Sequence, residues 1–147
     1  MTVLRSFVDT NVFVYAADES PEERDKHKIA SSLLVADPDE LVISTQVLQE
    51  FYVTVTRKLR TPLSTQRAAS AVRAMAKLDV VHVDVPLVFA AMDTSRAARI
   101  SLWDALMIEA ARQAGCSRIL SEDLSNGQVI RNVVVENPFL PDPSGPG

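Results

Sequence analysis

Hydrophobic and polar positions divide the chain into two kinds of segment. Short, predominantly apolar runs are typical of strands buried on both faces of a parallel sheet, and they occupy residues 3–8, 41–43, 80–83, 118–120 and 133–135. Longer stretches with apolar residues every three or four positions predict helices, and they occupy residues 12–17, 22–36, 45–59, 65–78, 86–98 and 102–114. The alternation predicts an α/β fold of three layers, with a mostly parallel central sheet of about five strands covered by helices.

The boundaries between these segments carry residues that start or stop helices. Asp37-Pro38 ends one helix, because proline cannot continue it, and Gly115 stands at the C-terminal end of another. Neither a repeat nor an internal linker interrupts the 147 residues. We therefore expect one domain over residues 1–137, followed by a flexible tail rich in proline and glycine over residues 138–147.

Composition excludes several functions that an α/β domain often serves. A net charge of −4 argues against a protein that holds nucleic acid by bulk positive charge. The single cysteine allows neither an internal disulfide nor a zinc site built from cysteines. Only Gly115 and Gly127 precede the tail, so neither glycine-rich nucleotide-binding loop is present. No stretch approaches the roughly 20 apolar residues of a membrane helix, and we expect a cytoplasmic protein.

Four acidic residues fall where an α/β sheet usually binds its ligands. Asp9 directly follows the first strand, and Asp123 lies three residues past the fourth. Glu50 lies in the helix after the second strand, and Asp104 opens the helix before the fourth. Because ligands bind beyond the carboxyl ends of parallel strands, we expect the four side chains to meet in one pocket.

Several carboxylates in one pocket repel each other, so they must take up protons or bind cations. Ligand sets of oxygen alone favour Mg²⁺ or Mn²⁺, and such ions commonly activate water against phosphodiesters. Each acid also has an ordinary structural explanation. Asp9 suits a helix cap, Asp104 a capping box in S-L-W-D, Asp123 a turn, and Glu50 a solvated helix face.

Four motifs around these acids resemble the PIN domain, and more narrowly the VapC-type toxins of bacterial toxin–antitoxin pairs. The motifs are V-D-T-N-V-F-V-Y-A from position 8, L-Q-E-F from position 48, L-W-D-A-L-M-I-E-A-A from position 102 and L-S-E-D-L from position 120. The resemblance extends from residue 3 to about residue 137. It implies a Rossmann-like fold and Mg²⁺-dependent cleavage of RNA.

The resemblance also assigns roles to residues of this chain. The implied catalytic acids are Asp9, Glu50, Asp104 and Asp123; of these, Asp9, Asp104 and Asp123 would bind the metal, supported by Thr10 and Asn11. VapC-type relatives usually dimerise, and a partner antitoxin inserts a segment near the site. Transfer RNA and ribosomal RNA are both plausible substrates within that family.

The distribution of charge suggests how an acidic chain could hold RNA. Residues 52–78 contain no acid but six basic side chains. We expect Arg57, Lys58 and Arg60 to line an RNA groove, although a solvated helix face explains them equally well. Phe89 is expected in the core, and Trp103 is expected to pack rather than to stack on bases.

The pattern as a whole predicts a metal-dependent endoribonuclease that acts as the toxin of a type II toxin–antitoxin pair. Three alternatives remain open. One is a phosphatase-like hydrolase with Asp9 as nucleophile, although Asn11 occupies the position where such enzymes carry a second aspartate. The others are a non-catalytic RNA-binding or regulatory module and a nuclease directed at DNA.

Overall fold

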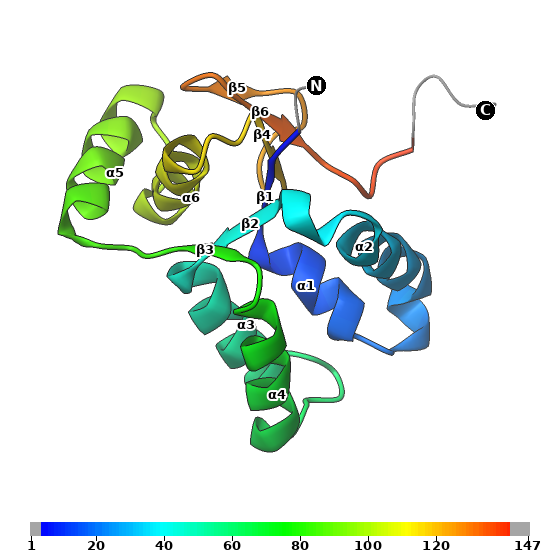
Figure 1. Cartoon of the computed structure of the whole chain (residues 1–147). Helices are drawn as coiled ribbons and strands as arrows, with labels where there is room; N and C mark the ends of the chain where they lie inside the picture. Colours follow the sequence, from blue (N-terminus) through cyan, green and yellow to red (C-terminus); the bar gives the residue numbers. More distant parts are fainter. Residues whose placement is uncertain (1–3, 142–147) are drawn as a thin grey trace.

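The computed structural model describes residues 4–141 and contains a six-stranded sheet at its centre (Figure 1). The strands lie in the order β3-β2-β1-β4-β6-β5. They are β1 (Ser6–Val8), β2 (Leu41–Ser44), β3 (Asp79–Val81), β4 (Arg118–Leu120), β5 (Val129–Ile130) and β6 (Val133–Glu136). Every neighbouring pair is parallel except β5 and β6, which confirms the mostly parallel sheet.

Six α-helices cover this sheet. They are α1 (Thr10–Ala17), α2 (Arg24–Ala36), α3 (Thr45–Arg57), α4 (Thr65–Met75), α5 (Val85–Ala98) and α6 (Leu102–Gln113). In Figure 1, α5 and α6 lie on one side of the sheet, α1 and α2 lie on the other, and α3 and α4 extend below. The helices on both sides confirm the α/β fold expected from the sequence.

Burial explains why the strands read as apolar runs. The central strand β1 is buried along its whole length, and β2 likewise. Phe7 on β1 and Phe51 on α3 are among the largest fully buried side chains. Helix starts are fixed by side-chain caps, as where the hydroxyl of Ser44 accepts a hydrogen bond from the amide of Val47. Capping hydrogen bonds of this kind therefore fix the point where a strand ends and the next helix begins.

Strand β5 was not expected from the sequence. It pairs with β6 in an antiparallel hairpin whose two turn residues, Arg131 and Asn132, have φ of 51° and 68°. Two-residue hairpin turns of this conformation usually carry Asn-Gly or Asp-Gly. Because Arg131 has no such preference, the sequence lacks the usual signal for the turn.

The expectation that Phe89 lies in the core is wrong, since the residue is 61% exposed. Helix α5 buries Leu87, Ala91 and Thr94 instead. Phe89 is two positions from both Leu87 and Ala91, about 200° around the helix from each, so it lies off that buried face. Small side chains let α5 and α6 pack closely without it.

The segment after β6 packs against the domain as far as it is described. The ring of Phe139 lies 4.9 Å from that of Tyr15, measured between ring centroids, in an edge-to-face arrangement. Residues 142–147 of the expected flexible tail lie outside the described residues. None of the helices within residues 4–141 combines the length and the apolar character needed to cross a bilayer.

Candidate active site

Asp9 lies at the carboxyl end of β1 and caps the N-terminus of α1. Its side chain is 2% exposed and accepts three hydrogen bonds. One carboxylate oxygen accepts the backbone amide of Thr10 (2.6 Å), and the other accepts the Ser121 hydroxyl (2.6 Å) and the Asn11 amide (3.2 Å). Burial raises the pKa of Asp9 to about 6, although the hydrogen bonds from Ser121 and Thr10 oppose this.

Glu50 on α3 reaches the same place from a different element. Its carboxylate accepts a hydrogen bond from the Thr10 hydroxyl (3.0 Å) and one from the side-chain amide of Gln46 (2.9 Å). Gln46 is buried and also donates to the backbone carbonyl of Trp103 (3.3 Å). Gln46 therefore joins α3 to the first turn of α6, a role that sequence reasoning missed. Its spacing of four residues from Glu50, one helical turn, was the available signal.

Asp104 lies in the first turn of α6. Its backbone amide donates to the Ser101 hydroxyl (3.0 Å), so Ser101 caps α6 as the structural explanation of this motif predicts. Partial burial raises the pKa of the Asp104 carboxyl, the hydrogen bond with Ser101 lowers it, and the charges of Asp123 and Glu50 raise it further. Capping and participation in a charged cluster are therefore compatible in one residue.

Asp123 is exposed in the loop after β4, where its amide donates to the Ser121 hydroxyl (3.1 Å). Its negative charge raises the pKa of both Asp9 and Asp104, and so does the charge of Glu50. We refer to Asp9, Glu50, Asp104 and Asp123 as the acidic cluster. The structure thus brings the four acids from separate elements into electrostatic contact.

A cavity of about 730 Å³ opens at the acidic cluster. Asp9, Glu50 and Asp123 line it, whereas Asp104 does not. Thr10 and Asn11 also lie in its wall. The cavity runs between α1 and α3 as far as Lys58 and is large enough for part of a nucleic-acid strand.

The ligand chemistry of the cluster suits a hard cation, because all its side-chain donors are oxygens. Within residues 4–141, no three His, Cys, Asp or Glu side chains stand close enough to share one metal ion as they are arranged. The buried carboxylate of Asp9 feels only negative neighbours among the charges that shift its pKa. A bound cation would stabilise its charged form.

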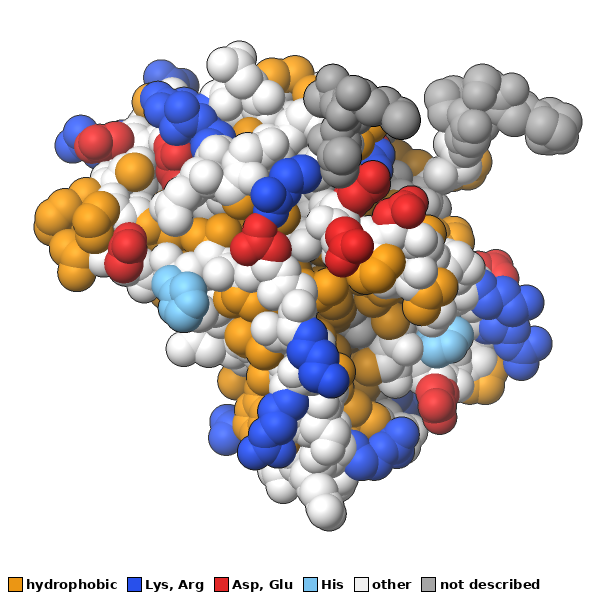
Figure 2. Space-filling view, in the orientation of Figure 1, with side chains coloured by type: hydrophobic (Ala, Val, Ile, Leu, Met, Phe, Trp, Pro, Cys, Tyr) orange, Lys and Arg blue, Asp and Glu red, His pale blue; other side chains and the backbone are white. Residues whose placement is uncertain are grey.

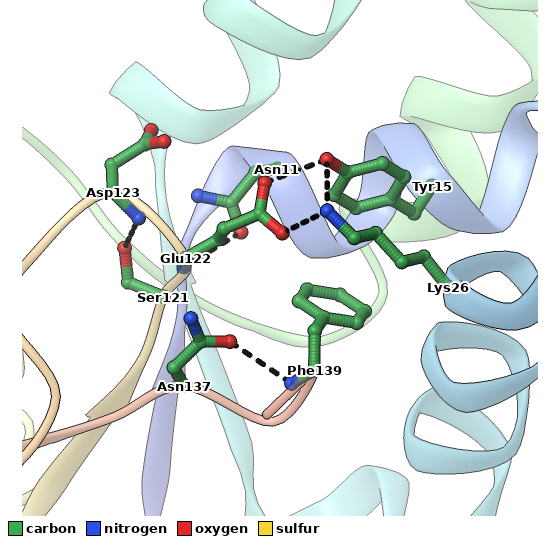
Figure 3. A network of polar contacts seen from close by, with 8 residues as sticks. All are labelled: Asn11, Tyr15, Lys26, Ser121, Glu122, Asp123, Asn137 and Phe139. Carbon is green, nitrogen blue, oxygen red and sulfur yellow. Dashed lines mark hydrogen bonds and ion pairs between the residues drawn. The ribbon is translucent and has the colours of Figure 1, made fainter. Parts of the chain in front are cut away.

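A second network holds the loop that carries Asp123 (Figure 3). The carboxylate of Glu122 accepts hydrogen bonds from the Tyr15 hydroxyl and the Lys26 ammonium, both at 2.6 Å. The backbone amide of Glu122 donates to Asn11 (3.3 Å). Burial alone would raise the pKa of Glu122, but the bonds from Lys26 and Tyr15 outweigh it and lower that pKa. The Glu122 carboxylate, which lines the same cavity, is therefore bound by side chains of α1 and α2.

Lys26→Met is expected to loosen this loop. The Lys26–Glu122 ion pair is partly exposed, so its loss should lower the free energy of unfolding by about 1 kcal/mol. Without this ion pair Glu122 is held less firmly, and so is its neighbour Asp123. The binding of Mg²⁺ to the protein should therefore weaken. Chemical denaturation and Mg²⁺ titration measure both effects. Lys28→Met, an exposed change on the same helix, is the matched control, and equal behaviour of the two variants would contradict the assignment.

Only one of the three basic residues expected to line an RNA groove lies at the cavity. Lys58 lines the cavity, whereas Arg60 forms an exposed ion pair with Glu22 (2.6 Å). Arg57 lies in the exposed last turn of α3. Lys and Arg side chains gather over the end of the molecule formed by α3 and α4 (Figure 2). The expectation that Trp103 packs is wrong, because that residue is 62% exposed.

The structure is an α/β domain in which acidic residues follow the carboxyl ends of strands β1 and β4. The sequence matches the PIN domain over residues 6–126, so the chain belongs to the PIN domain family. Comparison with curated protein sequences gives no significant match.

Solved structures of VapC toxins and toxin–antitoxin complexes share this fold. Mycobacterium tuberculosis VapC20, described as a toxin that cleaves the sarcin–ricin loop, is 23% identical, with a TM-score of 0.62 over 80% of this chain and 89% of that one. A Klebsiella pneumoniae toxin–antitoxin complex is 16% identical, with a TM-score of 0.66 over 90% and 97%. DNA-bound VapBC of Salmonella typhimurium is 17% identical, with a TM-score of 0.65 over 90% and 97%.

Proposed function

We propose that this PIN domain is a metal-dependent endoribonuclease and the toxin of a type II toxin–antitoxin pair. The observation that carries the proposal is the buried Asp9 carboxylate, held beside Glu50 and Asp123 in a cavity of about 730 Å³. Burial and like charges raise its pKa to about 6. Such a group is neutralised at physiological pH most readily by a divalent cation.

In this proposal Asp9, Asp104 and Asp123 would hold Mg²⁺, or Mn²⁺ in its place, once their carboxylates move closer together than they stand in the described residues. The ion supplies positive charge for the phosphate and makes a water molecule more acidic. Thr10 and Gln46 fix the Glu50 carboxylate at the cavity wall, where it would orient an attacking water and accept its proton. Asn11 and Thr10 support the site by holding Asp9 and Glu50 in place.

The proposed substrate is RNA, transfer RNA and ribosomal RNA being the candidates. Lys58 supplies a phosphate contact from within the cavity, and Arg57 and Arg60 extend the basic surface beyond it. VapC20, whose fold is similar, is described as cleaving the sarcin–ricin loop, which favours RNA over DNA. We therefore place the scissile phosphate at the acidic cluster.

We further propose that an antitoxin regulates the protein and that two copies associate in the cytoplasm. The similar folds from Klebsiella pneumoniae and Salmonella typhimurium were solved in toxin–antitoxin complexes, which supports the antitoxin. Exposed Val85, Phe89 and Met92 repeat along one side of α5 and support self-association.

The test is digestion of matched RNA and DNA oligonucleotides by the purified protein. RNA should be cut with Mg²⁺ or Mn²⁺, EDTA should stop the reaction, and DNA should remain intact. A phosphoenzyme trapped at Asp9 would favour the phosphatase alternative. RNA bound but uncut in Mn²⁺ would favour a regulatory module, and cleavage of DNA alone would overturn the choice of substrate.

A further inference from the structure

Trp103 is the sole tryptophan of the chain, and the structure leaves it 62% exposed. It lies in the first turn of α6, where the following residues Ala105 and Leu106 are buried. A tryptophan normally buries a large apolar surface, so an exposed tryptophan indicates that a ligand or a partner covers its ring.

The backbone that presents this indole is held firmly. The carbonyl of Trp103 accepts a hydrogen bond from Gln46 (3.3 Å), and Gln46 also donates to Glu50 (2.9 Å). The Ser101 hydroxyl caps the same turn. Successive residues of a helix project about 100° apart. The backbone of Trp103 therefore borders the acidic cluster through Gln46, and its indole leaves the helix about 100° from the side chain of Asp104.

An exposed cation stands at the same end of the α5–α6 pair. Arg99 ends α5 with φ of 56° and ψ of 47°, a left-handed conformation that glycine adopts more easily. The backbone amide of Arg99 bonds to the Ser95 carbonyl and closes the helix there, which leaves the Arg99 side chain exposed just before the start of α6. The guanidinium of Arg99 is suited to a phosphate.

We propose that Trp103 and Arg99 form a nucleobase subsite next to the acidic cluster. The indole stacks on the base of a nucleotide flanking the cleaved phosphate, and Arg99 contacts the backbone of that strand. This inference rests on the proposed ribonuclease function and narrows its substrate to RNA with an unpaired base at the cleavage position, because bases within a duplex are already stacked.

The surroundings of Trp103 favour a base over a protein partner. Its exposed neighbours in the chain, Ser101 and Arg99, are polar, and Asp104 is charged. A protein interface usually surrounds an aromatic anchor with a contiguous apolar core. A single flat ring beside a cation and a phosphate-cleaving centre instead matches the stacking platforms of single-strand binding sites.

The sole tryptophan reports directly on this subsite through its fluorescence. The full-length Asp9→Asn variant is titrated with a short oligoadenylate in Mg²⁺, and with an abasic ribose-phosphate oligomer of the same length. Oligoadenylate should quench the fluorescence saturably, and the abasic oligomer should not. In the otherwise wild-type chain, Trp103→Ala should raise KM for RNA cleavage about tenfold, whereas Trp103→Phe should retain most of the affinity.

Val35→Ala removes an apolar side chain that is 77% exposed on α2 and is the matched control, for which KM should stay unchanged. Equal quenching by both oligomers, or an unchanged KM in Trp103→Ala while the wild type cleaves RNA, would refute the subsite but leave the ribonuclease function standing. Fluorescence that changes with protein concentration alone would assign Trp103 to a contact between two copies and would also refute it. Quenching by oligoadenylate without cleavage in the wild type would support the subsite and count against the ribonuclease.

Discussion

Asp104→Asn is expected to lower RNA cleavage by about a hundredfold or more while the protein stays folded. Loss of groups that only support metal ligands commonly costs up to about a hundredfold, and a direct ligand should cost at least as much. The charges of Asp123 and Glu50 disfavour the ionised Asp104 in the metal-free protein. Removing its charge should therefore leave the melting temperature in EDTA unchanged or higher.

The matched control is Asp93→Asn, the same substitution at an exposed acid on α5 whose side chain is 79% exposed. Cleavage rates at saturating Mg²⁺ and melting curves in EDTA should be measured for both variants. Retained cleavage in Asp104→Asn would remove this residue from the proposed mechanism. Lost cleavage with a lower melting temperature would instead show that the carboxylate of Asp104 acts mainly by stabilising the start of α6.

The alternation of strands and helices was predictable because burial on both faces leaves β1 and β2 almost wholly apolar. The helix starts were predictable where a serine caps the chain, as Ser44 does. Hairpin β5–β6 was not, because its turn places Arg131 in a conformation that the residue type does not favour. The conformational preferences of single residues therefore predict the elements that follow common rules. They do not predict the β5–β6 hairpin, which tertiary packing imposes.

Aromatic residues show a different limit of sequence reasoning. Phe89 lies between Val88 and Ala90 and Phe51 follows Glu50, yet Phe51 is buried and Phe89 is 61% exposed. Which helix face meets the sheet depends on small residues such as Ala91, which allow α5 to approach α6 closely. Hydrophobicity alone does not distinguish a core residue from an exposed one on such a helix.

Topology placed Asp9 at the end of the first strand and Asp123 after the fourth, and the structure has both there. Gln46 and Lys26 could not be placed in the same way. Gln46 matters because it joins Glu50 to α6, and Lys26 because it holds Glu122 from a separate helix. The spacing of four residues indicates the bond from Gln46 to Glu50 within α3, but the bonds from Gln46 to α6 and from Lys26 to Glu122 depend on packing between elements, which leaves no period in the sequence.

The metal-free protein is expected to lose stability as pH rises from about 4 to 7, because of Asp9. Its pKa is about 6 in the folded protein against an ordinary value of 3.8. Between these values the folded chain keeps a proton that the unfolded chain has released, so the free energy of unfolding falls with rising pH. At 1.36 kcal/mol for each pH unit, the loss reaches about 3 kcal/mol above pH 6.

Urea unfolding in EDTA at several pH values measures this loss, and Asp9→Asn should remove most of it because asparagine does not ionise. Glu122, whose pKa is lowered, acts in the opposite sense but is present in both chains, so the difference between their curves isolates Asp9. Mg²⁺ should restore the stability of the wild type above pH 6 and have little effect on Asp9→Asn, since a cation stabilises the ionised carboxylate that the variant lacks. Parallel curves for the two proteins would show that burial of Asp9 carries no electrostatic cost, and the argument for a cation at this carboxylate would then fail.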